Sequence, residues 1–173
     1  MAKLETILVA VKEASESLGV SKLKKEQKDA LVAFASGRDV FVSLPTGFGK
    51  SLCYSCLPGV FARLRSTACS SDSSIELFPI VVIVSPLVSI MKDQTRDFNQ
   101  RGLSSIYVTS SLDQDEELAV LQGKFSLVYI SPEQLLARGK WREMLRSDVY
   151  QKRMVGFAVD EAHCVKKWYA HYC

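Results

Sequence analysis

The sequence predicts an α/β fold in which a mainly parallel sheet is flanked by helices. Short apolar runs rich in β-branched residues alternate with stretches of helical periodicity, the pattern of repeated βαβ units. A glycine-rich turn follows the first apolar run, and an acidic pair follows the last one. The chain of 173 residues, 47% apolar and 24% charged, has the composition of an ordinary globular domain.

The chain is predicted to begin with two amphipathic helices. The first is expected over 3–18, and Gly19 ends it. Its inward face comprises Leu4, Ile7, Leu8, Val11 and Leu18. The second is expected over 25–36, with Gly37 as its C-terminal stop. Ala30, Leu31 and Phe34 form its inward face.

A strand, a turn, a helix and a loop are expected next. The run 40–44 is apolar and β-branched, which predicts a buried strand. Residues 45–49 then form a turn, and a helix follows over 50–64. The small polar residues 66–74 predict a surface loop.

The remainder of the chain is expected to alternate between strands and helices. The strands are predicted over 80–85, 105–108, 127–130 and 155–159. The helices are predicted over 87–100 and 113–122, with further helical segments over 133–147.

Composition excludes several classes of protein. The net charge of +3 is too small to predict a nucleic-acid partner and does not exclude one. The longest apolar stretch is far shorter than the roughly 20 residues that cross a bilayer, so no membrane association is expected. Five cysteines without a signal peptide indicate an intracellular, reducing environment rather than secretion. Cys53 and Cys56 have no second pair at zinc spacing, so helix packing is favoured for them over metal binding.

The segment 44–51, Leu-Pro-Thr-Gly-Phe-Gly-Lys-Ser, lies between the first predicted strand and a predicted helix. In that context it indicates a phosphate-binding loop, in which glycines expose backbone N–H groups to an anion. Lys50 would bind the β- and γ-phosphates, and the Ser51 hydroxyl would bind Mg²⁺. Leu44 stands where the strict pattern has glycine. The alternative is a chance glycine-rich turn with a solvated lysine.

The acidic pair Asp160–Glu161 directly follows the last predicted strand. Ligands of parallel α/β sheets bind at the carboxyl ends of strands. Asp160 is therefore a candidate Mg²⁺ ligand, and Glu161 a candidate for orienting or deprotonating an attacking water. The alternative is a polar exit from the strand.

Several segments resemble motifs of one family, the RecQ DNA helicases of helicase superfamily 2. Residues 23–27 (Leu-Lys-Lys-Glu-Gln) are similar to an adenine-reading motif, with Leu in place of Phe and Lys in place of Arg. Residues 45–54 resemble the extended phosphate loop, and 85–94 resemble a motif that meets the DNA backbone. Residues 129–133 and 160–168 are similar to two further motifs, the second containing Asp-Glu-Ala-His.

This resemblance, over residues 20–168, implies the first RecA-like lobe of a 3′–5′ DNA helicase. The expected organisation is an N-terminal helix over 1–19 and an ATP-binding P-loop domain over 20–173 that is incomplete at its C-terminus. The complete enzyme would couple ATP hydrolysis, with Mg²⁺, to movement along single-stranded DNA and to unwinding. By resemblance the location would be the nucleus.

The resemblance also implies roles for single residues. Lys50, Asp160 and Glu161 would be catalytic. The ATP-binding residues would be Lys24, Gln27, Thr46, Gly47, Phe48, Gly49, Lys50 and Ser51. The residues that contact DNA or couple it to hydrolysis would be Ser85, Pro86, Lys92, Gln94, Ser131, Pro132, His163 and Trp168. Lys24 is alternatively part of a solvated basic helix face, and Trp168 alternatively caps the core.

The last five residues, 169–173, depart from the Gly-His-x-Phe-Arg that follows the tryptophan in the family. The family's second lobe and its arginine finger are absent from this chain, so it would supply half of an ATP site and negligible hydrolysis by itself. The alternatives are a nucleotide- or DNA-binding module without helicase activity and the lobe of an RNA helicase. A small-molecule kinase would leave the segments around Gln27 and Ser85 unexplained.

Overall fold

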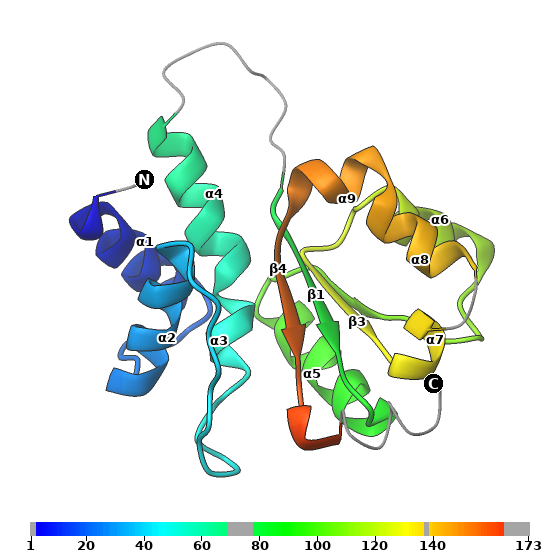
Figure 1. Cartoon of the computed structure of the whole chain (residues 1–173), viewed down its shortest axis with the longest axis horizontal. Coiled ribbons are helices and arrows are strands. Elements are labelled where there is room, and N and C mark those ends of the chain that lie inside the picture. The colour runs from blue at the N-terminus through cyan, green and yellow to red at the C-terminus, as the bar shows by residue number, and fades with distance from the viewer. Residues whose placement is uncertain (1–2, 69–77, 137–138, 165–173) are drawn as a thin grey trace. The chain divides into compact units, whose positions relative to one another are not determined.

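The computed structural model describes residues 3–68, 78–136 and 139–164. The chain forms two compact units, Met1–Pro79 and Ile80–Cys173 (Figure 1). Among the helices of the described segments, none is long and apolar enough to cross a membrane.

The described part of the first unit is helical. It contains α1 (Leu4–Ser17), α2 (Lys25–Ala35), α3 (Leu52–Ser55) and α4 (Leu57–Ala68). Helix α1 packs against α4 and α2, and its buried face includes Ile7 and Val11. A Cβ on Gly59 of α4 would lie 3.0 Å from the Cβ of Ala14, so glycine permits the close approach of these two helices. The helices that precede and follow the glycine-rich loop, α2 and α4, are therefore both packed against α1.

The two predicted N-terminal helices are confirmed, with small shifts at their ends. Gly19 and Gly37 follow them with φ values of 76° and 87°, the left-handed conformation that favours glycine at a helix end. Leu4 is 60% exposed because it lies in the first turn, beyond the packing of α1 against its neighbours.

The strand expected over 40–44 is wrong. The structure assigns neither helix nor strand there, and Phe41 is 84% exposed. A strand is stabilised by hydrogen bonds to a neighbouring strand, and the described sheet joins only four strands, all from residue 80 onward. An apolar, β-branched run therefore stays irregular here because it has no partner among them.

Two other expectations in the first unit need correction. The helix predicted over 50–64 begins at Leu52 and is divided into α3 and α4. Pro58 explains the division, because proline lacks an N–H and its ring clashes with the carbonyl four residues earlier. In the loop expected over 66–74, residues 66–68 instead continue α4, and the rest lies outside the described residues.

The second unit contains a parallel sheet. Its strands are β1 (Ile80–Val84), β2 (Ser105–Tyr107), β3 (Leu127–Ile130) and β4 (Met154–Val159), in the order β2-β3-β1-β4. Each neighbouring pair is parallel, which confirms the predicted fold class. Every residue of β1 and β3 is buried, as expected for inner strands covered on both faces.

Helices complete this unit. They are α5 (Val88–Gln100), α6 (Gln114–Leu121), α7 (Pro132–Leu136), α8 (Lys140–Arg146) and α9 (Asp148–Arg153), before a short 3₁₀ turn over Ala162–Cys164. Alternate residues of the strands pack with Val120 of α6, Trp141 of α8 and Tyr150 of α9 in one core. These helices lie together on one side of the strands (Figure 1), whereas α5 contacts β2 and β3 through a separate buried set that includes Met91. Helix α9 was not predicted from the sequence.

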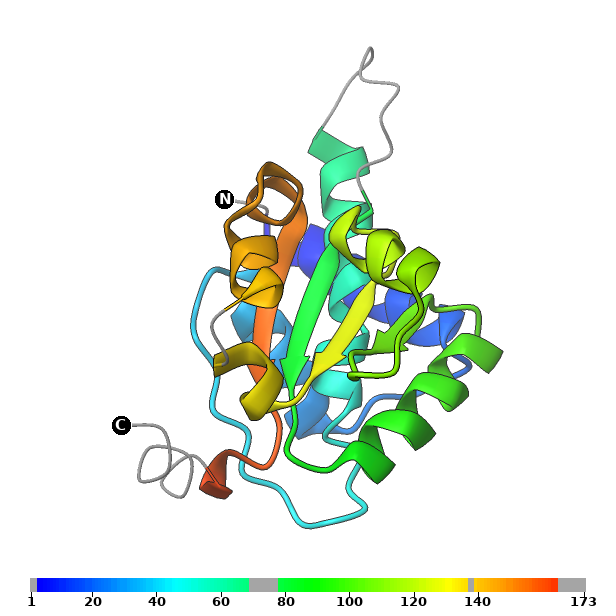
Figure 2. The same ribbon diagram turned by 90° about the vertical axis from the view of Figure 1, so that its right-hand side faces the viewer.

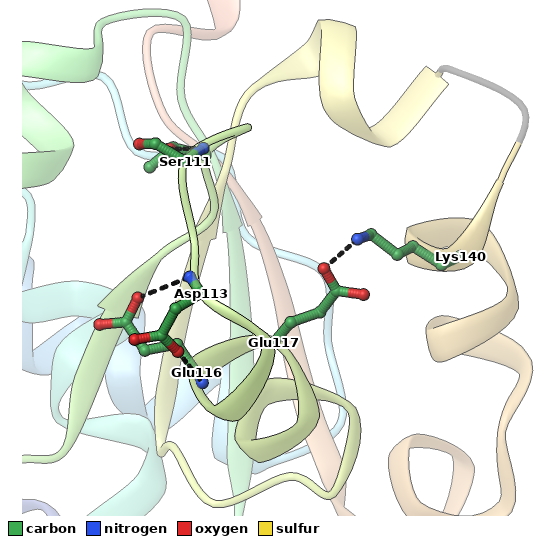
Figure 3. Close-up of polar contacts among 6 residues, drawn as sticks. Ser111, Asp113, Glu116, Glu117 and Lys140 are labelled. Carbon is green, nitrogen blue, oxygen red and sulfur yellow. Dashed lines mark hydrogen bonds and ion pairs between the residues drawn. The ribbon is translucent and has the colours of Figure 1, made fainter.

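Polar contacts fix α6 in place (Figure 3). Asp113 accepts a hydrogen bond from the Glu116 backbone N–H at 2.7 Å, and the Glu116 carboxylate accepts one from the Asp113 N–H. This reciprocal capping satisfies N–H groups that a helix start leaves without partners. Glu117 of α6 forms an ion pair with Lys140 of α8, so the same turn also joins α6 to α8.

Candidate active site

The predicted phosphate loop is a glycine-shaped turn in the first unit. Gly47 and Gly49 have φ values of 78° and 85°, and the Phe48 N–H donates to the Pro45 carbonyl at 3.2 Å. Among the described residues, the N–H groups of Gly47, Gly49, Lys50 and Ser51 donate to no protein acceptor. Consecutive unengaged N–H groups in such a turn form a cradle for an anion. The loop therefore fits a phosphate group.

The Lys50 ammonium lies against this loop. Its Nζ donates to the Leu44 carbonyl at 3.0 Å and to the Pro45 carbonyl at 3.4 Å. An ammonium group has three donors, and a phosphate oxygen is a stronger acceptor than a neutral carbonyl. Lys50 can therefore exchange these carbonyls for an incoming phosphate.

Gln27 joins helix α2 to the loop. Its side chain is 3% exposed, and its Oε1 accepts a hydrogen bond from the Lys24 backbone N–H at 2.9 Å. Its Nε2 donates to the carbonyls of Phe48 and Gly49, both at 3.0 Å. An amide offers two donor hydrogens and an acceptor, so the loop carbonyls engage the whole donor capacity of Gln27.

Lys24 makes a second connection from α2 to the loop. Its Nζ donates to the Phe48 carbonyl at 3.2 Å and lies 3.7 Å from the centroid of the Phe48 ring. This is within the range of a cation–π contact. The resemblance predicts that Lys24 and Phe48 lie near a nucleotide, but it gives no signal that the two side chains touch each other.

The second unit aligns three sequence-predicted residues along one edge of its sheet. Val84 of β1 is in register with Ile130 of β3 and with Val159 of β4. Ser85, Ser131 and Asp160 each come directly after one of these residues. Because the strands are parallel, these three residues form a row in the order Ser131, Ser85, Asp160. Neighbouring positions in such a row are separated by about 5 Å, the spacing of strands.

Glu161 lies at the end of this row in an unusual conformation. Its φ is 53°, the left-handed region that residues other than glycine rarely adopt. The Asp160 Oδ1 accepts a hydrogen bond from the Glu161 N–H at 3.0 Å, and the Glu161 Oε2 is 3.2 Å from His163 Nδ1. Backbone strain of this kind is concentrated at functional sites. Asp160 and Glu161 therefore both lie on one tight turn directly after β4.

The residues expected to contact DNA are not equally accessible. Lys92 and His163 are exposed, and Pro86 and Gln94 are half-buried. The Ser85 side chain is fully buried, and its hydroxyl has no hydrogen-bond partner among the described residues. Ser131 and Pro132 are also buried, and the Ser131 hydroxyl caps α7 by accepting from the Gln134 N–H at 3.3 Å. Trp168 lies outside the described residues.

The predicted Mg²⁺ ligands belong to different units, Ser51 to the first and Asp160 to the second. Within the described ranges, no group of three or more His, Cys, Asp or Glu side chains is placed to hold a metal ion. Cys53 and Cys56 are not exceptions. Burial raises the pKa of the Cys53 thiol to about 11 and that of Cys56 to about 12, which keeps both thiols neutral at pH 7.

Comparison with known proteins identifies relatives of this chain. A family model described as DEAD/DEAH box helicase matches residues 24–172. The chain is 32% identical to the ATP-dependent DNA helicase hus2/rqh1 of Schizosaccharomyces pombe over 84% of its length. It is 33% identical to the probable ATP-dependent DNA helicase RecS of Bacillus subtilis and 31% identical to the RecQ-like DNA helicase blm-1 of Caenorhabditis elegans, each over 87% of its length.

The matched region is a small part of each relative. The chain spans 10% of the S. pombe protein, 27% of the B. subtilis protein and 14% of the C. elegans protein. It corresponds to a partial helicase domain of these larger proteins. The loop with Lys50 and the Asp160–Glu161 turn both lie inside the matched residues. The chain therefore belongs to the DEAD/DEAH box helicase family, as a partial helicase domain homologous to RecQ DNA helicases.

Proposed function

We propose that this chain is the ATP-binding lobe of a RecQ-like 3′–5′ DNA helicase. In the complete enzyme it would couple ATP hydrolysis to movement along single-stranded DNA and to strand separation. The observation that supports this most is the loop of the first unit, with unengaged N–H groups at Gly47, Gly49, Lys50 and Ser51. Such a loop binds phosphate groups, and all relatives named above are called DNA helicases.

Each residue has a role in this proposal. Lys50 binds the β- and γ-phosphate oxygens of ATP, and the loop N–H groups hold the phosphates in position. Gln27 hydrogen-bonds adenine, and Lys24, Thr46 and Phe48 lie beside the nucleotide. Mg²⁺ held by Ser51 and Asp160 would neutralise phosphate charge. Glu161 accepts the proton of the attacking water or orients that water.

The DNA side of the proposal rests on the carboxyl edge of the sheet. Pro86, Lys92 and Gln94 follow β1 there, and Ser131 and Pro132 follow β3. The exposed Lys92 ammonium offers charge to a phosphate of the strand. Buried Ser85 shapes the segment that leads to Lys92, and His163 and Trp168 couple DNA binding to hydrolysis. A nuclear location completes the proposal; a tagged protein confined to the cytoplasm would contradict that part.

The first test is nucleotide binding by the chain and its Lys50→Ala variant. Removing the ammonium should weaken ATP binding at least tenfold, because charged hydrogen bonds to phosphate are lost. Isothermal titration calorimetry with a non-hydrolysed ATP analogue measures the dissociation constant. Lys124→Ala is the matched control, since it removes the same charge from an exposed turn of the second unit. Equal affinities in the two variants would contradict the assignment of the loop.

The second test concerns ATP hydrolysis and the choice between DNA and RNA. With residues 1–173 joined to a second RecA-like lobe, Lys50→Ala should abolish DNA-stimulated ATP hydrolysis. The chain by itself should show negligible hydrolysis, because a missing arginine finger costs about 10³–10⁵ in rate. Competition between matched DNA and RNA single strands separates the proposal from an RNA helicase lobe. Preference for RNA would favour that alternative.

A further inference from the structure

We infer that Lys24 and Phe48 form a clasp that holds the phosphate loop closed and sets the affinity of the chain for nucleotide. This inference rests on the proposed function, because it assumes that the loop binds a nucleotide. It concerns a pair of side chains that packs together in this structure and that neither the sequence motifs nor the comparisons assign to each other.

The clasp is defined by contacts at Phe48. Lys24 Nζ lies 3.7 Å from the ring centroid and donates to the carbonyl of the same residue at 3.2 Å. Gln27 Nε2 donates to that carbonyl as well, at 3.0 Å. Lys24 is the N-cap residue of α2, and Gln27 lies in the first turn of that helix. The N-terminal end of α2 thus contacts both the ring and the backbone carbonyl of Phe48.

In the same closed arrangement, hydrogen bonds to loop carbonyls occupy the groups that a nucleotide needs. Both amide hydrogens of Gln27 are engaged by the loop carbonyls of Phe48 and Gly49. The Lys50 ammonium is engaged by the carbonyls of Leu44 and Pro45. A nucleotide must therefore compete with the loop carbonyls for the Gln27 amide and the Lys50 ammonium. The apparent dissociation constant of a site is the intrinsic constant divided by the fraction of molecules that are open, so a mostly closed loop raises it.

Phe48 contributes to this closed state through its ring, which no other contact of the clasp replaces. Without the ring, Lys24 retains only a single exposed hydrogen bond to the loop. A cation–π contact at an exposed site is weak but measurable. We expect its removal to shift the loop toward the open state and to tighten nucleotide binding about fivefold. The gain should appear as faster association, because the closed state delays entry.

The experiment compares Phe48→Ala with the unchanged chain, using stopped-flow association of a fluorescent ADP analogue. Phe41→Ala is the matched control, because Phe41 is 84% exposed and precedes the loop. The expected result is about fivefold faster association for Phe48→Ala and no change for Phe41→Ala. In a Lys24→Met background, replacing Phe48 should have little further effect, because the cation that the ring holds is already gone.

A second measurement does not depend on nucleotide. The backbone N–H groups of residue 48, Leu52 and Cys53 donate to carbonyls of the loop. Their hydrogen exchange should be faster in Phe48→Ala than in the unchanged chain, whereas exchange in α1 should be unaltered. Equal exchange of these N–H groups, or equal or slower nucleotide association by Phe48→Ala, would overturn the clasp. An effect of Phe48→Ala that persists at full size in Lys24→Met would also overturn it. Failure of the proposed function looks different: the unchanged chain would then bind no nucleotide at all.

Discussion

Gly47 and Gly49 have similar backbone angles but different surroundings. Both have φ values that an L side chain rarely adopts. A Cβ on Gly47 would meet nothing within 4 Å, whereas a Cβ on Gly49 would lie 2.7 Å from Gln27 Nε2. The two positions therefore separate the cost of backbone conformation from the cost of displacing a buried amide.

Alanine substitution should resolve these two costs. Gly47→Ala should lower the free energy of unfolding by about 1 kcal/mol, the price of a left-handed L residue. Gly49→Ala should lower it by about 2–3 kcal/mol, because the buried Gln27 amide also loses hydrogen bonds. Urea unfolding followed by circular dichroism measures both. Equal losses would show that Gln27 does not hold the loop.

The thiols of Cys53 and Cys56 predict a pH dependence. Burial raises their pKa values from 9.0 to about 11 and about 12, and the neighbouring Cys53 adds to the shift at Cys56. The folded chain therefore retains protons that the unfolded chain releases above pH 9. This contribution to stability is complete below about pH 9 and is lost as the pH rises toward 11.

Two measurements check that expectation. At pH 8, alkylation of Cys53 and Cys56 should be about 100-fold slower in the folded chain than in urea, because thiolate is the reactive form. The free energy of unfolding should fall between pH 9 and 11, and less steeply in a Cys53→Ala, Cys56→Ala double variant. Stability that rises across this range would refute the assignment.

A buried hydroxyl joins helix α9 to α6. Tyr150 is fully buried, and its Oη donates to the Val120 carbonyl of α6 at 2.8 Å. Tyr150→Phe should lower the free energy of unfolding by about 1 kcal/mol, the usual net value of such a bond. Tyr107→Phe is the control, because Tyr107 is half-buried on β2, and it should change stability by less than about 0.5 kcal/mol. Comparable losses, measured in urea, would contradict this role.

Secondary structure could be predicted wherever a local pattern determines it. The strands β1 and β3 follow from their continuous apolar runs, since inner parallel strands are buried on both faces. The run 40–44 carries the same signal and is not a strand, because pairing depends on a partner that the run itself does not encode. Helix α9 escaped prediction because it is six residues long and is capped by Ser147 rather than marked by periodicity.

For the candidate site too, the sequence predicts what chain topology determines and misses what side-chain packing determines. Parallel topology was enough to expect Asp160 at the carboxyl edge of the sheet, and register then places it in a row with Ser85 and Ser131. The grip of Lys24 and Gln27 on Phe48 could not be expected, because it joins segments more than 20 residues apart through side-chain packing. The residue roles drawn from the motifs remain predictions. The contacts of Lys24 and Gln27 with Phe48 show how these side chains are held beside the loop.

The net charge of the whole chain is too small to determine its response to salt. A charge of +3 on 173 residues gives a weak overall field. If the chain binds single-stranded DNA, its salt dependence should therefore reflect local contacts. Each phosphate contact contributes about 0.7 to the slope of log K against log salt for single strands. Among the DNA-contact candidates that the structure describes, Lys92 is the one lysine or arginine, so the slope should be shallow.

Lys92→Gln tests this reasoning. Lys92 is exposed on α5, just after the carboxyl end of β1, whereas Lys124 is exposed before the amino end of β3, at the opposite edge of the same sheet. Both substitutions remove one positive charge and alter the overall field equally. Lys92→Gln should reduce the slope by about 0.7 and weaken binding to all sequences alike, because a phosphate contact is lost. Lys124→Gln should leave the slope unchanged. Fluorescence anisotropy with labelled single strands at several salt concentrations measures both, and identical effects would show that DNA responds to net charge rather than to this edge.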